Sequence, residues 1–85
     1  MINSRRSEIE IVSEILTLAK NGTRKTRILY QTNLSYTQLQ SYLSFLLKAN
    51  VLEIENLDAI KIYKTTPKGL EIMENITKVI AGLTS

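Results

Sequence analysis

Two short helical segments that lie only three residues apart constrain the fold of this chain more than any other feature. The second lies within residues 33–48, where Ser35 and Gln38 have the spacing of a capping box. In such a box each side chain bonds the other residue's backbone N–H and fixes the helix start. Residues 32–34 link the segments, and Asn33 tolerates the left-handed conformation that a tight turn requires. The spacing predicts two helices packed across a tight turn.

The helix within residues 33–48 has one apolar face and one polar face without acids. An ordinary solvated face mixes Glu with Lys, whereas hydroxyls, amides and cations suit base edges and phosphates. This helix alone does not decide between a solvated face and a face that lies against nucleic acid. Its apolar residues are Leu39, Tyr42, Leu43, Leu46 and Leu47; its polar residues are Thr37, Ser41, Ser44 and Lys48, with Gln38 and Gln40 on the flanks.

The helix before the tight turn, from residue 23 or 24 to residue 31, begins with cations. Arg24, Lys25 and Arg27 lie in its first turn, where the macrodipole disfavours each positive charge by roughly some tenths of a kcal/mol. A bound phosphate would reverse the effect, because free N–H groups and cations would then surround one anion. Phosphate binding therefore explains this sequence better than side chains that merely extend into solvent. Together the two helices predict a helix-turn-helix.

A further helix is expected before this motif. Ser7 and Glu10 have the spacing of another capping box, and the helix that it opens continues to about residue 20, before a turn at Asn21-Gly22. Apolar residues cover well over a third of its circumference, which predicts a central position in the core. The expected stripe is Ile9, Val12, Leu16 and Ala19, widened by Ile11, Ile15 and Leu18.

After residue 50 the apolar period changes from helical to two, which predicts a hairpin. Residues 51–55 and 60–64 are the expected strands and residues 56–59 the loop. Three helices followed by a hairpin predict a mainly α winged helix-turn-helix. The wing tip carries Asp58 without Arg or Lys, which argues against deep insertion into a minor groove. The expected dry face is Leu52, Ile54, Ile60 and Ile62, and the expected wet pair is Glu53 or Glu55 opposite Lys61.

The last predicted helix begins at Thr66-Pro67, with Thr as N-cap and Pro at the first helical position. Gly69 costs about 1 kcal/mol relative to Ala inside a helix, so close backbone packing is expected there. The apolar surface exceeds what one small domain covers, and we favour a dimer seam over an extra core layer. The stripe is Leu70, Met73, Ile76, Ile80 and Leu83, broadened by Ile72 and Val79; the expected dimer contacts are Met73, Ile76, Ile80 and Leu83.

Composition limits the function classes. The chain has 85 residues, which is one domain, and a core of this size gains much from dimerisation. Neither cysteine nor histidine is present, so disulfides, thiolate chemistry and the commonest base and metal ligand are excluded. No carboxylate pair has catalytic spacing, and we expect no enzyme, metal or cofactor; the sequence does not indicate a small-molecule effector. The net charge of +3 suits an anionic partner.

The chain has no apolar run of bilayer length, and we expect no signal peptide, since Arg5 and Arg6 precede Ser-Glu-Ile-Glu. It is therefore expected to be soluble and cytoplasmic, without a membrane partner. We divide it into a basic N-terminal tail (residues 1–6), a DNA-binding domain (residues 7–66) and a C-terminal dimerisation helix (residues 67–85) packed on that domain.

Five motifs are spread along nearly the whole chain: Ser7-x-x-Glu10-Ile11, Lys25-Thr26-x-Ile28-Leu29-Tyr30, Asn33-Leu34-Ser35-Tyr36, Leu39-x-x-Tyr42-Leu43-x-x-Leu46 and Tyr63-x-x-Thr66-x-Lys68-Gly69. Through them the chain resembles the archaeal winged helix-turn-helix DNA-binding proteins. This family includes cellular and viral transcription regulators and small chromatin-type dimers; for a viral member the location would be the host cytoplasm. Thr32 departs from the small apolar residue expected there, and the last helix is shorter than that of chromatin-type members.

The resemblance implies a homodimer that binds double-stranded DNA with the helix starting at Ser35. Base contacts are expected from the start of that helix, except from Gln38, which the capping box occupies. Tyr36 projects towards the apolar side in this prediction and packs or bonds a phosphate. The alternatives are non-specific chromatin-type binding and a protein-interaction scaffold, for which an exposed Phe45 would speak; otherwise Phe45 packs beside the last helix. Predicted base contacts are Tyr36, Thr37, Gln40 and Ser41; predicted phosphate contacts are Arg24, Lys25, Thr26, Arg27, Ser44 and Lys48.

Overall fold

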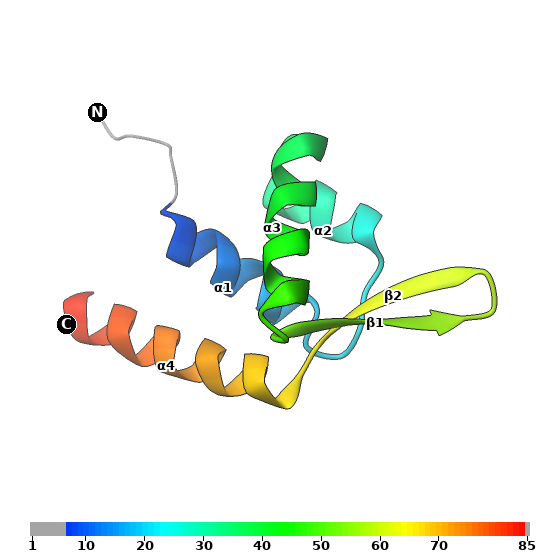
Figure 1. Cartoon of the computed structure of the whole chain (residues 1–85). Helices are drawn as coiled ribbons and strands as arrows, with labels where there is room; N and C mark the ends of the chain where they lie inside the picture. Colours follow the sequence, from blue (N-terminus) through cyan, green and yellow to red (C-terminus); the bar gives the residue numbers. More distant parts are fainter. Residues whose placement is uncertain (1–6, 85) are drawn as a thin grey trace.

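A computed structural model describes residues 7–84 and contains four helices and one two-stranded antiparallel sheet within that range (Figure 1). Three helices, a hairpin wing and a last helix confirm the predicted winged helix. The first helix ends about two residues earlier than predicted, and the second begins one or two residues later. The elements are α1 (Glu8–Leu18), α2 (Lys25–Thr32), α3 (Tyr36–Lys48), β1 (Leu52–Leu57), β2 (Ile60–Thr65) and α4 (Pro67–Thr84).

Both predicted capping boxes are present. The Glu10 N–H donates to Ser7 Oγ at 3.1 Å, and the Ser7 N–H donates to Glu10 Oε1 at 2.9 Å. At α3 the Gln38 N–H donates to Ser35 Oγ at 3.1 Å, and the Ser35 N–H donates to Gln38 Oε1 at 3.0 Å. Each cap stabilises its helix by about 1 kcal/mol. The start of α3 is therefore fixed by local sequence.

The turn between α2 and α3 follows the prediction for Asn33, which has φ 58° in the left-handed region. Its N–H donates to the Leu29 carbonyl at 3.1 Å. Thr32 is fully buried, and its hydroxyl donates to the Ile28 carbonyl at 2.7 Å. This bond explains how a hydroxyl is tolerated where a small apolar side chain was expected, because the buried donor has a partner.

The core lies where α1, α2, α3 and the root of the wing meet. Ile9 was predicted to belong to the buried stripe of α1, because it lies two turns before Leu16 on the same side of the helix. The prediction was wrong, since Ile9 is 55% exposed. Val12 and Leu18 are half-buried. The buried apolar residues are Ile11, Ile15, Leu16, Ala19, Ile28, Leu39, Leu43, Leu46, Val51, Leu52 and Tyr63.

The strand register of the wing corrects the predicted dry face. The strands extend to a two-residue turn, Asp58-Ala59, so even-numbered residues of β1 lie opposite odd-numbered residues of β2. Opposed residues share a face in an antiparallel pair. Ile54 therefore shares a face with Tyr63, whereas Ile62 lies opposite Glu55. The predicted acid–lysine pair was also wrong, since Lys61 lies opposite Asn56, and Glu53 opposite Lys64.

A backbone bridge that sequence analysis missed attaches the wing to the domain. The Thr23 N–H donates to the Tyr63 carbonyl at 2.9 Å, and the Tyr63 N–H donates to the Thr23 carbonyl at 2.7 Å. Thr65 is buried, and its hydroxyl donates to the Leu16 carbonyl at 2.7 Å. The wing root is thus held by the segment between α1 and α2 and by α1 itself.

The last helix begins as predicted, because the Gly69 N–H donates to the Thr66 hydroxyl at 3.0 Å. Figure 1 shows α4 leaving the wing and running beside α1. The Thr17 hydroxyl of α1 lies 3.4 Å from Met73 Sδ. No helix within residues 7–84 has the length and apolar character needed to cross a membrane.

Candidate nucleic-acid interface

The outer face of α3 is polar apart from the exposed Phe45, and the whole helix carries no acid. Its inner face packs into the core through Leu39, Leu43 and Leu46, with Tyr42 and Leu47 half-buried at the margins. This division confirms the two faces predicted from helical spacing. The exposed polar residues of the outer face and its flanks are Thr37, Gln38, Gln40, Ser41, Ser44 and Lys48.

The start of α2 is basic and has no side-chain cap. Arg24 is the N-cap residue and makes no capping hydrogen bond, and the first turn contains no acid. Arg24, Thr26 and Arg27 are exposed, whereas Lys25 is half-buried. Because the first backbone N–H groups of a helix lack intrahelical partners and carry partial positive charge, the charges here favour an anion.

Lys25 and Tyr36 join the starts of α2 and α3. Lys25 Nζ donates to Tyr36 Oη at 3.2 Å and lies 4.8 Å from the centre of the tyrosine ring. Tyr36 is 58% exposed, so it does not pack in the core. It is the first residue of α3, where the ring reaches α2 instead of the core. The two residues are 11 positions apart, and no sequence pattern indicated their contact.

Lys48 stands apart from this basic cluster. It is the last residue of the 13-residue helix α3, so it lies roughly 18 Å along the axis from Tyr36 at 1.5 Å per residue. Lys48 is exposed. The structure thus brings Lys25 of α2 to the start of α3 and places a separate cation, Lys48, at the end of α3, and one phosphate cannot contact both.

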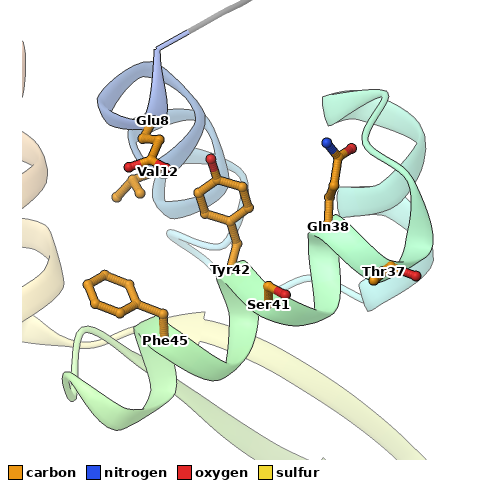
Figure 2. Close-up of a pocket in the computed structure, with 7 residues that line it drawn as sticks. All are labelled: Glu8, Val12, Thr37, Gln38, Ser41, Tyr42 and Phe45. Carbon is orange, nitrogen blue, oxygen red and sulfur yellow. The ribbon is translucent and has the colours of Figure 1, made fainter.

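A groove runs between the start of α1 and α3, beside the polar face (Figure 2). Phe45 is 64% exposed and lines this groove, so it does not take the predicted place beside the last helix. Figure 2 shows Tyr42 and Phe45 projecting from α3 and Val12 from α1. Phe45 could be singled out from the sequence, whereas the presence of Glu8 at the same groove could not. The lining residues are Glu8, Val12, Thr37, Gln38, Ser41, Tyr42 and Phe45.

The described part of the chain, residues 7–84, brings together no three His, Cys, Asp or Glu side chains that could hold a metal ion. The polar groups of the candidate interface are aliphatic hydroxyls, amides, two tyrosine hydroxyls and cations. Such groups bind by hydrogen bonding and charge.

Comparison with known proteins identifies relatives along almost the whole sequence. The family described as winged helix-turn-helix matches residues 5–83. The uncharacterized protein MJ0287 of Methanocaldococcus jannaschii is 33% identical over 78 residues, which span 84% of this chain and 80% of that protein. Protein MJ0290 of the same organism is 36% identical over 76 residues, or 88% of this chain. The match spans only 34% of the length of MJ0290.

Two solved structures have the same fold. Sso10a-2, a DNA-binding protein from Sulfolobus solfataricus, is 31% identical with a TM-score of 0.78, over 89% of this chain and 80% of that one. AF1382 from Archaeoglobus fulgidus is 23% identical with a TM-score of 0.74, over 91% of this chain and 87% of that one. These matches confirm the resemblance to archaeal winged helix-turn-helix proteins that the sequence motifs indicated.

Proposed function

The chain belongs to the winged helix-turn-helix family, and from this premise we propose that it binds double-stranded DNA as a homodimeric transcription regulator. The observation that carries the proposal is the acid-free outer face of α3 next to the uncapped, basic start of α2. The similarity to Sso10a-2, which is described as a DNA-binding protein, supports it. The protein acts as a binding module in this proposal, without catalysis.

We propose that α3 enters the major groove with its N-terminal half, as recognition helices do. Thr37, Gln40 and Ser41 are exposed there, and their side chains can bond base edges. Gln40 can pair in bidentate fashion with adenine, and the Thr37 methyl can contact a thymine methyl. Gln38 is excluded because its amide oxygen accepts from the Ser35 N–H.

We propose two groups of phosphate contacts. Arg24, Lys25, Thr26 and Arg27 form the first group at the start of α2, where Lys25 contacts the first residue of α3. Ser44 and Lys48, in the C-terminal half of α3, form the second. Phosphate contacts set register and orientation, whereas base contacts specify sequence. Two anchor points roughly 18 Å apart along α3 would hold the helix at a defined angle in the groove.

Replacing Lys25 by alanine tests DNA binding through phosphates. We expect weaker binding to all duplex sequences and a salt slope reduced by about one unit per protomer, because one counterion fewer is released. Fluorescence anisotropy with a random duplex and the protein's own promoter, at several salt concentrations, measures both quantities. Lys20→Ala is the matched control, since Lys20 is exposed after the end of α1, at a groove that is otherwise lined by residues of α4. An unchanged slope for Lys25→Ala would contradict the proposed contact.

Selection of random duplexes tests the base contacts. We expect wild type to enrich half-sites that contain A·T pairs, spaced roughly one or two helical turns apart, and Gln40→Ala to lose preference at one position. Gln38→Ala serves as comparison: it should lower stability by about 1 kcal/mol and leave the motif unchanged. An identical motif from wild type and Gln40→Ala would remove Gln40 as a reader. The absence of any motif would favour non-specific, chromatin-type binding.

The exposed Phe45 favours a second candidate, a protein-interaction winged helix. Phe45 lies in a groove with Val12, Tyr42 and Glu8, and an acid beside aromatic residues suits a protein better than a phosphate. The salt titration separates the two candidates. A wild-type protein that binds no duplex at low salt would transfer the assignment to the protein-interaction class.

A further inference from the structure

We infer that Lys25 and Tyr36 together form a two-donor clamp for one backbone phosphate, in which Tyr36 positions the lysine ammonium. This inference rests on the DNA binding proposed above and names the site of one contact. It also changes the role of Tyr36 from a reader of bases to a residue that serves the phosphate backbone.

The hydrogen bond between the two residues leaves donors available on both. Lys25 Nζ donates to Tyr36 Oη at 3.2 Å. An ammonium has three donors, of which this bond uses one, and the phenol keeps its own O–H to donate. Tyr36 is 58% exposed, so the pair is open to solvent. A phosphate oxygen that approaches the starts of α2 and α3 can therefore accept hydrogen bonds from both side chains.

The tyrosine ring also restricts where the ammonium can lie. Lys25 Nζ is 4.8 Å from the ring centre, within the distance at which a ring attracts a cation. A free lysine loses much rotamer freedom when it is immobilised in an interface. Because the contact with Tyr36 restricts Lys25 before DNA arrives, less freedom is lost on binding.

The location of the pair gives this contact a consequence for register. Lys25 is the first residue of α2 and Tyr36 the first residue of α3. A phosphate bound by both would attach the DNA backbone directly to the start of the recognition helix. The readers Thr37, Gln40 and Ser41 follow on the next turns of α3, so their depth in the groove would depend on this anchor.

A double-mutant cycle between Lys25 and Tyr36 tests the clamp, with duplex affinity, salt slope and melting temperature as readouts. We expect Tyr36→Phe, which keeps the ring and removes the hydroxyl, to weaken duplex binding about 3- to 10-fold, because one hydrogen bond to a charged group is lost. In the Lys25→Ala background the same change should cost less than about 2-fold. The melting temperature should stay within about 2 °C of the parent, since both residues lie at the surface.

Tyr30→Phe is the matched control, because Tyr30 is 81% exposed on the neighbouring helix α2 and should tolerate loss of its hydroxyl without effect on binding. Equal losses from Tyr36→Phe in both backgrounds, or wild-type affinity of Tyr36→Phe, would overturn the clamp while leaving DNA binding intact. A parallel fall of affinity and melting temperature would assign the pair a structural role and overturn it as well. Failure of wild type to bind any duplex would instead refute the proposed function, and the clamp with it.

Discussion

Replacing Gly69 by alanine is expected to destabilise the protein by about 3 kcal/mol, although alanine is the better helix former by about 1 kcal/mol. For a domain of this size the melting temperature should fall by more than about 10 °C. Gly69 is buried in the first turn of α4. Steric overlap with backbone outweighs helix propensity here, because a backbone atom cannot move aside as a flexible side chain can.

A β-carbon at Gly69 would overlap the Val51 carbonyl oxygen and approach Thr65 Cγ2 to 2.7 Å. The Val51 carbonyl also accepts from the Thr66 N–H at 3.1 Å, so it cannot shift without disturbing the start of α4. Gly82→Ala is the control within the same helix, since in the described part of the chain no atom beyond its neighbours and the adjacent helix backbone lies within 4 Å of an added β-carbon. It should be neutral or stabilising by up to about 1 kcal/mol. Equal thermal stability of the two variants, measured by circular dichroism, would contradict the explanation.

Local sequence determined the features of the fold that were predicted correctly. Ser35 with Gln38, Asn33 at the turn and Thr66 before Pro67 act through bonds between residues close in the chain. Such signals are readable without knowledge of the tertiary structure. Gly69 was also predicted to allow close packing, because a glycine inside a helix needs a compensating contact, but the partner Val51 could not be named from sequence.

Long-range pairing decided the features that were predicted wrongly or missed. The register of the wing follows from a two-residue turn at Asp58, whose φ of 56° lies in the left-handed region. The bridge between Thr23 and Tyr63 joins segments about forty residues apart. The spacing of apolar residues indicates a helix or a strand, but it does not determine which face of the strand meets the core.

The candidate site was predictable in its residue types and only partly in its geometry. The acid-free face of α3 and the cations of α2 follow from composition at helical spacing. The contact between Lys25 and Tyr36 depends on how α2 packs against α3, which a single sequence does not specify. The acid Glu8 beside Phe45 likewise arises from the packing of α1 on α3.

The dimer seam that we propose on α4 is narrower than the sequence stripe. Met73 packs against the core of its own protomer and contacts Thr17 of α1. Ile76 and Ile80 are half-buried, whereas Leu83 is 81% exposed and Val79 58% exposed. Exposing large apolar side chains to water is unfavourable in free energy. A second copy that packs along the C-terminal half of α4 would cover Ile76, Val79, Ile80 and Leu83, but not Met73.

Val79→Glu is therefore expected to convert a dimer into a monomer and to weaken binding to a duplex with two half-sites about 100-fold, because the two recognition helices no longer bind as one unit. Sedimentation at high micromolar concentration measures the mass, and anisotropy measures the affinity. Ala81→Glu adds the same charge roughly 200° around the helix and should leave both unchanged. Ile80→Glu should act like Val79→Glu, but Val79 is the sharper test because its side chain is exposed in one protomer and its loss spares the core. A dimeric Val79→Glu variant would place the two-fold axis elsewhere on the protein. A monomeric wild-type protein would contradict the proposed dimer altogether.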